Sequence, residues 1–279
     1  MPTVLLACAT ALFYGCSDFF GGLASRRDYA LRVTASAHLL GAVLLGAAAL
    51  FLAAHATASD LLWGVATGVA GGIGVTALYA ALARGRMSVV APITAALSGT
   101  LPALFDLARG TAVSALSLVG LGVAIIAVVI VSAADGGAES GGMPPAALGL
   151  SLVAGLGFAA SFVMLSFTSP AAGIMPVLSA RMTSAVVLTA AALWRHRTLG
   201  VAPGALPSTV AAGALDAAAT VAMLAAIHAG PLAVAAVIGS LYPVATILLA
   251  RFVLGERLRP VQRAGVALAL IAVLLTALH

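Results

Sequence analysis

The sequence predicts an all-α integral membrane protein whose ten transmembrane helices form two inverted repeats of five helices. Three observations predict this class. Hydrophobic residues make up 63% of the 279 residues and charged residues only 8%, a balance that soluble globular domains do not have. Apolar runs follow one another through the chain, and the second half repeats features of the first. A bilayer accepts such helices because lipid surrounds their apolar faces.

Ten apolar runs are long enough to cross a bilayer, which takes about 20 residues of helix. They are residues 3–24, 31–53, 60–83, 87–108, 113–133, 146–167, 173–194, 205–227, 231–251 and 260–278. The first run lacks a basic amino-terminal region, so we expect it to remain as a helix and not to be removed as a signal peptide. A Gly-rich stretch separates two groups of five runs. We therefore expect a first repeat at residues 1–134, a linker at 135–145 and a second repeat at 146–279.

The two halves align at a constant offset of 145 residues without a gap. The offset places Gly68 on Gly213 and Gly85 on Gly230, and it places the run Ile126 to Val128 on residues 271–273. Chance matching in a chain rich in Ala, Val and Leu is the alternative. Because five is an odd number, the second repeat would enter the bilayer from the side opposite to the first.

The charges indicate an orientation. All 13 basic side chains are arginines, and eleven of them fall on one face when the helices alternate, with Arg109 on the other face and Arg181 inside the membrane. The eleven are Arg26, Arg27, Arg32, Arg84, Arg86, Arg195, Arg197, Arg251, Arg257, Arg259 and Arg263. The positive-inside rule makes their face cytoplasmic and puts both termini outside, in the inner (plasma) membrane. The net charge of +5 thus indicates topology, and we expect no nucleic-acid partner.

Three stretches resemble the EamA family of the drug/metabolite transporter superfamily. They are FYGCSDFFGGLASRR at 13–27, ALARGRMSVVAPITAALS at 81–98 and SLYPVATILLARFVLGERLRPVQRAGVALALIAV at 240–273. The resemblance covers nearly the whole chain. It implies two inverted five-helix repeats and export of small metabolites such as amino acids, or of drugs. It also implies a central cavity lined mainly by the first, third, fourth, sixth, eighth and ninth helices.

The chain departs from the family in two respects. Thr111 stands in the first repeat where the second has Glu256, so that repeat has lost its acidic residue. In addition, some family members are placed with both termini in the cytoplasm, which is opposite to the orientation that the arginines indicate here.

Asp216 and Arg181 are the formal charges nearest the middle of the bilayer. A charge there costs on the order of 3 kcal/mol or more, so we expect both to face the bundle interior. Asp216 shares a helical stripe of small and polar side chains with Thr209, Gly213 and Thr220. We expect Arg181 to meet Asp216 directly or through water, as a fixed pair or as one that substrate opens. The alternatives are contacts of Arg181 with backbone carbonyls and solvent alone, and a purely structural role for Asp216.

Two further titratable residues are candidates for binding substrate or a coupling ion. Asp18 lies about two turns from the end of the first helix, and it could instead snorkel or pair with Arg26 or Arg27. His38 in the second run is a candidate proton relay, although a satisfied core histidine is the commoner case.

Aromatic and hydroxyl side chains complete the candidate site. Trp63 and Thr67 lie beside Gly68, the repeat mate of Gly213. The resemblance places Tyr14, Trp63 and Tyr242 on helices that line the cavity, with aromatic packing as the alternative for each. Pro92, Pro102 and Pro243 interrupt the fourth and ninth runs and are candidates for hinges in cavity-lining helices.

These features favour a secondary active transporter that exports a small, amino-acid-like metabolite by alternating access through a midplane cavity, coupled to a proton or another gradient. An exporter of cationic drugs such as quaternary ammonium compounds is the alternative within this class. A passive facilitator or channel is the alternative from another class, but it needs a continuous polar lining. The sequence shows no enzyme signature, metal-ligand spacing or phosphate loop. We expect no cofactor, a small-molecule substrate, the lipid bilayer as environment and a monomer.

Orientation can be tested with fusions to the carboxyl terminus. Because of the eleven-to-one arginine distribution, alkaline phosphatase placed after His279 is expected to be active and a fluorescent protein there to be dark. The reverse pattern would overturn the orientation and leave the inverted repeat standing.

Overall fold

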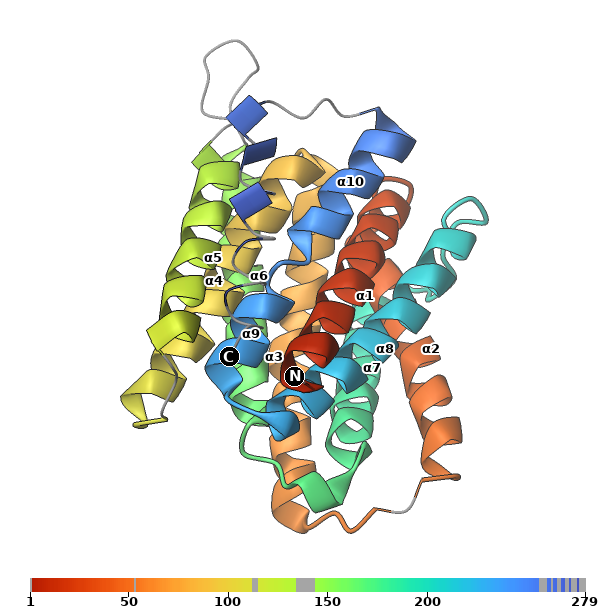
Figure 1. Ribbon diagram of the computed structural model, residues 1–279. Coiled ribbons are helices and arrows are strands. Elements are labelled where there is room, and N and C mark those ends of the chain that lie inside the picture. The colour runs from red at the N-terminus through yellow and green to blue at the C-terminus, as the bar shows by residue number, and fades with distance from the viewer. Residues whose placement is uncertain are drawn as a thin grey trace.

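The computed structural model describes residues 2–52, 54–111, 115–133 and 144–255, together with 260, 261, 263, 264, 267, 268, 271 and 275. Every regular element in this part of the chain is helical. The helices stand side by side in one bundle (Figure 1). They are α1 (Pro2–Ser25), α2 (Ala30–Ala49), α3 (Ala58–Arg84), α4 (Met87–Ala108), α5 (Ala115–Ala133), α6 (Pro145–Leu165), a 3-10 turn η1 (Pro170–Ala172), α7 (Met175–His196), α8 (Leu206–Ala229), α9 (Leu232–Gly239) and α10 (Pro243–Leu254).

Within the described residues, eight segments are long and apolar enough to cross a membrane. They agree closely with the predicted runs, and α4 has the predicted bounds of 87–108. The described helix α5, of 19 residues, follows the fifth run. Most of the last predicted run, 260–278, and nearly all of the predicted linker, 135–145, lie outside the described residues. A multi-pass all-helical membrane fold is therefore established, whereas the count of ten helices stays a prediction.

The ninth run, 231–251, corresponds to one apolar span, Leu232–Leu254, but the helix is interrupted within it, because α9 ends at Gly239 and α10 begins at Pro243, the predicted hinge. Proline has no N–H, and its ring clashes with the carbonyl four residues earlier, here that of Gly239. A tight turn takes the place of helix, with Leu241 N–H bonded to the Ile238 carbonyl and Tyr242 N–H to the Gly239 carbonyl. Pro92 and Pro102, in contrast, lie inside the continuous helix α4.

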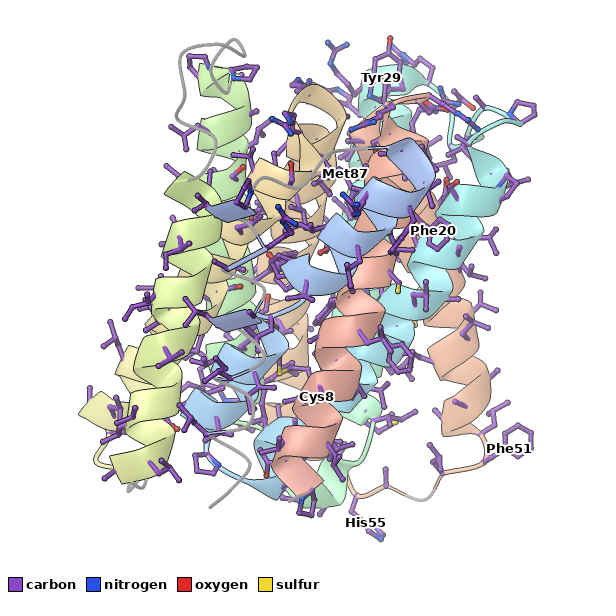
Figure 2. The ribbon with its side chains drawn as sticks, turned by 45° about the horizontal axis from the view of Figure 1, so that its top comes forward. Cys8, Phe20, Tyr29, Phe51, His55 and Met87 are labelled. Atoms are coloured by element: carbon purple, nitrogen blue, oxygen red, sulfur yellow. The ribbon has the colours of Figure 1, made fainter. Side chains whose placement is uncertain are left out.

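The connections gather at two opposite ends of the bundle, with Tyr29 near one end and Phe51 and His55 at the other (Figure 2). We call the first the arginine-rich end, where α1, α3 and α7 finish beside Arg26, Arg84 and Arg197. There Asp28 accepts a hydrogen bond from Ala202 N–H at 2.6 Å. Arg27 donates one to the Gly204 carbonyl at 2.6 Å, and Tyr29 stacks on His196. These contacts join the α1–α2 connection to the α7–α8 connection.

At the opposite end two more carboxylates join connections that are distant in sequence. Asp60 forms a capping box with Thr57 at the start of α3, and it also accepts a hydrogen bond from Ser169 N–H at 2.7 Å. Asp106, near the end of α4, accepts one from Ala233 N–H of α9 at 2.8 Å. Three long-range contacts to backbone N–H groups, from Asp28, Asp60 and Asp106, therefore hold the two ends.

The direction of α6 follows from the same contacts. Thr168, just after α6, contacts His228 near the end of α8 with 3.1 Å between Oγ1 and Nε2, and α8 begins at the arginine-rich end beside Gly204. The helix α6 therefore finishes at the opposite end, whereas α1 finishes at the arginine-rich end. The two helices run in opposite directions.

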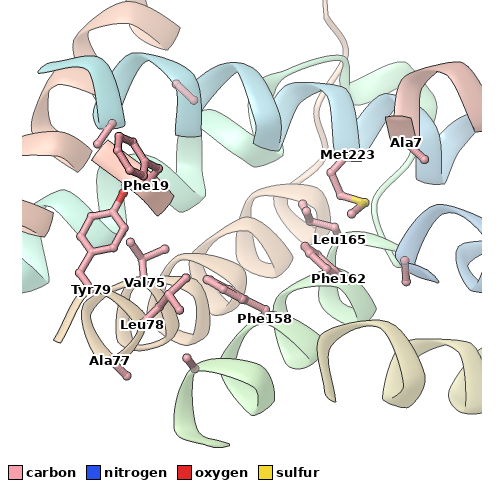
Figure 3. Close-up of a cluster of buried hydrophobic side chains, with 14 of the residues drawn as sticks. Ala7, Phe19, Val75, Ala77, Leu78, Tyr79, Phe158, Phe162, Leu165 and Met223 are labelled. Carbon is pink, nitrogen blue, oxygen red and sulfur yellow. The ribbon is translucent and has the colours of Figure 1, made fainter. Parts of the chain in front are cut away.

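Small residues let the helices approach closely, as is common inside membranes. α1 packs on α8, α3 on α6 and α7, and α2 on α7 and α8. Gly213 of α8 lies against the backbone of Ala37 in α2, and its repeat mate Gly68 in α3 lies against the backbone of Ala180 in α7. Larger side chains from α1, α3, α6 and α8 fill the space between these contacts, among them Phe19, Tyr79, Phe158 and Met223 (Figure 3).

The contact at Gly213 gives a test of this packing. A Cβ on Gly213 would lie 2.6 Å from the carbonyl oxygen of Ala37, so Gly213→Ala must push α2 and α8 apart. Overpacking of this kind typically costs about 1–3 kcal/mol. We expect Gly213→Ala to lower the thermal unfolding temperature in detergent and the membrane abundance.

Gly46 of α2 is the matched control, because a Cβ there meets nothing within 4 Å. Gly46→Ala is expected to leave both quantities unchanged or slightly raised, since alanine favours helix over glycine. Equal effects of the two substitutions would show that close helix contact at Gly213 does not limit stability.

Candidate functional site

An ion pair between Arg181 and Asp216 lies inside the bundle. Arg181 is in the second turn of α7 and Asp216 is near the middle of α8. The two residues are only 6% and 4% exposed. One terminal nitrogen of the guanidinium, Nη1, pairs with Asp216 Oδ2. The contact predicted from their depth is therefore present, and each buried charge has a partner of opposite sign.

Thr220 holds the second nitrogen of this guanidinium. Arg181 Nη2 donates a hydrogen bond to Thr220 Oγ1 at 2.8 Å, and Thr220 donates its own hydroxyl proton to the Asp216 carbonyl at 2.8 Å, one turn earlier. Tyr14 Oη lies 3.2 Å from Thr220 Oγ1. Because the only proton on Oγ1 is already used, Tyr14 must be the donor in this contact. The Tyr14 hydroxyl of α1 thus holds Thr220 in the position where it accepts the hydrogen bond from Arg181.

His38 of α2 approaches the pair from the other side. Its Nδ1 lies 2.8 Å from Ser184 Oγ, and Ser184 donates to the Arg181 carbonyl at 3.1 Å. Ser184 Oγ therefore accepts a hydrogen bond from His38, so Nδ1 is the ring nitrogen that carries the proton. His38 Nε2 is 3.7 Å from Asp216 Oδ2, which is beyond hydrogen-bond distance. The ring is 2% exposed and borders the pair directly.

These side chains surround a cavity of about 40 Å³. A water molecule needs about 10–15 Å³ on this measure, so the cavity has room for a few waters and not for a metabolite of several heavy atoms. Its wall is formed by Tyr14, His38, Thr67, Gly68, Gly71, Gly72, Val75, Phe158, Ser161, Phe162, Leu165, Ala180, Arg181, Ser184, Asp216 and Thr220. In this conformation the interior is closed around the ion pair.

The helices that line the cavity differ from the set that the resemblance implied. α1, α3, α6 and α8 line it as expected, but α2 supplies His38 and α7 supplies Arg181 and Ser184. α4 and α9 contribute no residue to this wall. The reason is that α2 packs against both α7 and α8, so its inner face reaches the pair, while α4 packs on α6 and α9 further from it.

Five of the remaining predicted site residues divide into two groups. Tyr14, Thr67 and Thr220 line the cavity. Trp63 and Tyr242 do not. Trp63 stacks on Phe167 near the opposite end of the bundle, with ring centroids 4.6 Å apart. The hydroxyl of Tyr242 donates to the Ala91 carbonyl of α4 at 3.3 Å. For these two aromatic residues the packing alternative describes the structure better.

Asp18 also lies away from the cavity wall. It is 4% exposed, so it does not snorkel to the membrane surface. No hydrogen bond or ion pair joins its carboxyl group to any residue that the structure describes. The alternative of an ion pair with Arg26 or Arg27 is therefore not supported among the described residues.

Sequence reasoning missed several lining residues, among them Ser161, Phe162 and Ser184. Ser184 follows Arg181 by three positions on the same face of α7 and fixes the ring of His38, and this spacing was the available signal. Ser161 and Phe162 of α6 had no comparable signal, because they stand in an apolar helix without a charged neighbour. In the described part of the chain, no group of three or more His, Cys, Asp or Glu side chains is arranged to hold a metal ion.

Comparison with known proteins identifies the family. A solved structure, described only as the crystal structure of a protein, superposes with a TM-score of 0.74 at 15% identity, over 99% of this chain and 96% of the other. At that identity the likeness concerns the fold alone. No curated protein matches the chain. Residues 145–278, which include α6 to α10, match the model of the EamA-like transporter family. This part of the chain thus belongs to that family of membrane transporters, which is consistent with the drug/metabolite transporter superfamily.

Proposed function

We propose that the protein is a secondary active exporter of small amino-acid-like metabolites, which works by alternating access between two inverted five-helix halves. The Arg181–Asp216 pair carries the proposal, because it places both signs of charge beside a closed interior cavity. The antiparallel course of α1 and α6, and the similar backbone contacts of Gly68 and Gly213, support the inverted halves. Both halves contribute to the cavity wall, so a relative motion of the halves would open it.

The chemistry of the pair favours a zwitterionic substrate. An α-amino acid carries a carboxylate that Arg181 can bind in a fork geometry and an ammonium group that Asp216 can bind. Such a substrate would replace the internal pair with two new pairs, so neither buried charge is left without a partner. Substrate entry would then avoid the several kcal/mol that an unpaired buried charge costs.

The same contacts disfavour the alternatives. A cationic drug would bind Asp216 only by displacing the tethered guanidinium of Arg181, which would leave that charge unpaired. A passive channel needs a continuous polar path, whereas the polar groups here border a cavity of only about 40 Å³, whose wall also includes the apolar side chains of Phe158 and Leu165. We therefore rank the amino-acid-like exporter above both.

Transport in proteoliposomes tests the proposal directly. Purified protein is expected to exchange at least one radiolabelled L-amino acid from a panel of the proteinogenic set against an internal pool of the same compound. Labelled tetraphenylphosphonium, a cation without a carboxylate, is expected not to exchange. Exchange of the cation without any amino acid would favour the drug-exporter alternative, and exchange of neither would refute the proposal.

The ion pair can be tested for stability and for function separately. Removing one partner of a buried pair typically costs about 3 to 5 kcal/mol, because the other charge is left alone, while removing both can be nearly neutral. Arg181→Ala and Asp216→Ala are each expected to lower membrane abundance. The double variant is expected to recover abundance without recovering amino-acid exchange. Additive losses of abundance would contradict a coupled pair.

A further inference from the structure

Asp18 differs from the other acidic residues that the structure describes. Asp28 pairs with Arg32 at 3.1 Å, Asp60 and Asp106 accept backbone N–H groups, and Asp216 pairs with Arg181. Asp18 alone among these five has neither a cation nor a hydrogen-bond donor within the described residues, although it is buried to the same extent as Asp216. A carboxylate in this position would be an uncompensated charge in an apolar interior.

The groups that face Asp18 do not offer a cation either. Those that interact with it electrostatically are Tyr14 and Cys16 on α1, Tyr79 on α3, Asp216 on α8 and Tyr242 just before α10. Four of them carry a neutral hydroxyl or thiol, and the fifth is a second carboxyl group. An isolated buried carboxylate costs many kcal/mol, and a carboxyl group escapes that cost by taking up a proton.

Asp216 is less suited to carry a proton. Its partner Arg181 keeps its charge at any physiological pH, so neutralising Asp216 would leave the guanidinium unpaired in the interior. The pair is therefore held in its charged form as long as it is intact. The carboxyl groups of Asp18 and Asp216 consequently differ: Asp216 is committed to a permanent cation, and Asp18 has no such partner among the described residues.

Of the two ends of the bundle, the arginine-rich end is the nearer to Asp18 along α1. Ser25 lies seven positions further along α1, on the same face of the helix, and it is 8% exposed with no hydrogen-bond partner for its hydroxyl group among the described residues. Ser25 lines a recess of about 500 Å³ that Arg26, Arg84 and His196 also border. At 1.5 Å per residue, Asp18 lies roughly 10 Å below the end of α1.

We propose that Asp18 carries the exchangeable proton of the transport cycle, taken up from and released to water at the arginine-rich end, while Arg181 and Asp216 stay charged and bind substrate. The inference rests on the proposed transport function. The chemical step is one proton transfer. An O–H bond of a hydronium ion that reaches Asp18 from that end breaks, an O–H bond to a carboxylate oxygen of Asp18 forms, and a water molecule is left; release is the reverse.

Infrared spectroscopy tests the proton without any substrate. Protein in lipid nanodiscs is expected to show the C=O stretch of a protonated carboxyl group, which shifts in heavy water. The band should disappear in Asp18→Asn and persist in Asp216→Asn, the matched control in the other buried carboxyl group. Asp18→Ser, smaller and also without a carboxyl group, provides a second variant if the amide destabilises the protein. A band that survives removal of the Asp18 carboxyl group, or no band in the wild type, would overturn the proposal.

Transport separates this inference from the proposed function. Asp18→Asn is expected to keep amino-acid exchange, which needs no net proton movement, and to lose accumulation driven by a pH gradient. Asp216→Asn is expected to lose both. Accumulation that persists in Asp18→Asn would overturn the role of Asp18. If the wild type exchanges no amino acid, the proposed function fails, and the infrared result still decides whether Asp18 holds a proton.

Discussion

A guanidinium that cannot lose its charge lies in the middle of an apolar bundle, and the arrangement around it follows from that constraint. Arg181 requires an anion at its own depth, and α8 supplies Asp216. Its second terminal nitrogen, Nη2, requires an acceptor, which is the hydroxyl oxygen of Thr220. That hydroxyl group in turn donates a hydrogen bond to the backbone carbonyl of Asp216. The carbonyl of Arg181 fixes Ser184, and Ser184 fixes the ring of His38. The hydrogen bonds that start at Arg181 therefore fix the orientation of Thr220 and of Ser184, and Ser184 in turn fixes that of His38.

The surrounding packing makes this pair possible. Helices that carried large residues at the contacts of Gly68 and Gly213 could not bring α2, α3, α7 and α8 close enough to exclude lipid from the centre. Gly41 of α2 serves the same purpose beside the arginine, because a Cβ there would lie 3.1 Å from Arg181 Cδ. Small residues at helix contacts and charges at the centre are thus two parts of one arrangement, in which close approach lowers the exposure of both charges to a few per cent.

Much of the fold could be predicted from the sequence, because the thickness of the bilayer fixes the length of a spanning helix and proline and glycine mark its limits. The eight membrane-spanning segments follow the predicted runs. The break before Pro243 was foreseen only as a hinge, since Pro92 and Pro102 show that a proline inside an apolar run can also leave the helix continuous. Local sequence does not decide between the two outcomes; the packing of neighbouring helices does.

The site was less predictable for a different reason. Depth along the chain was sufficient to pair Arg181 with Asp216, because a buried charge restricts its own partners. The sequence does not show which helices pack against one another at a given depth. For this reason the prediction places Trp63 and Tyr242 at a cavity that they do not line, and it omits Ser184. Asp18 shows the limit most clearly, since a carboxyl group without a partner among the described residues can be recognised only from its neighbours in space.

The three carboxylates that hold the ends of the bundle each accept a long-range hydrogen bond from a backbone N–H group, and Asp60 accepts a longer one from the Ser169 hydroxyl as well. A contact of this kind does not depend on which residue occupies the receiving position, because every residue except proline offers the same N–H group. The residues at positions 202, 169 and 233 can therefore be substituted while these backbone contacts persist. Each contact therefore tolerates substitution of the residue that donates its backbone N–H group better than substitution of the aspartate that accepts the hydrogen bond.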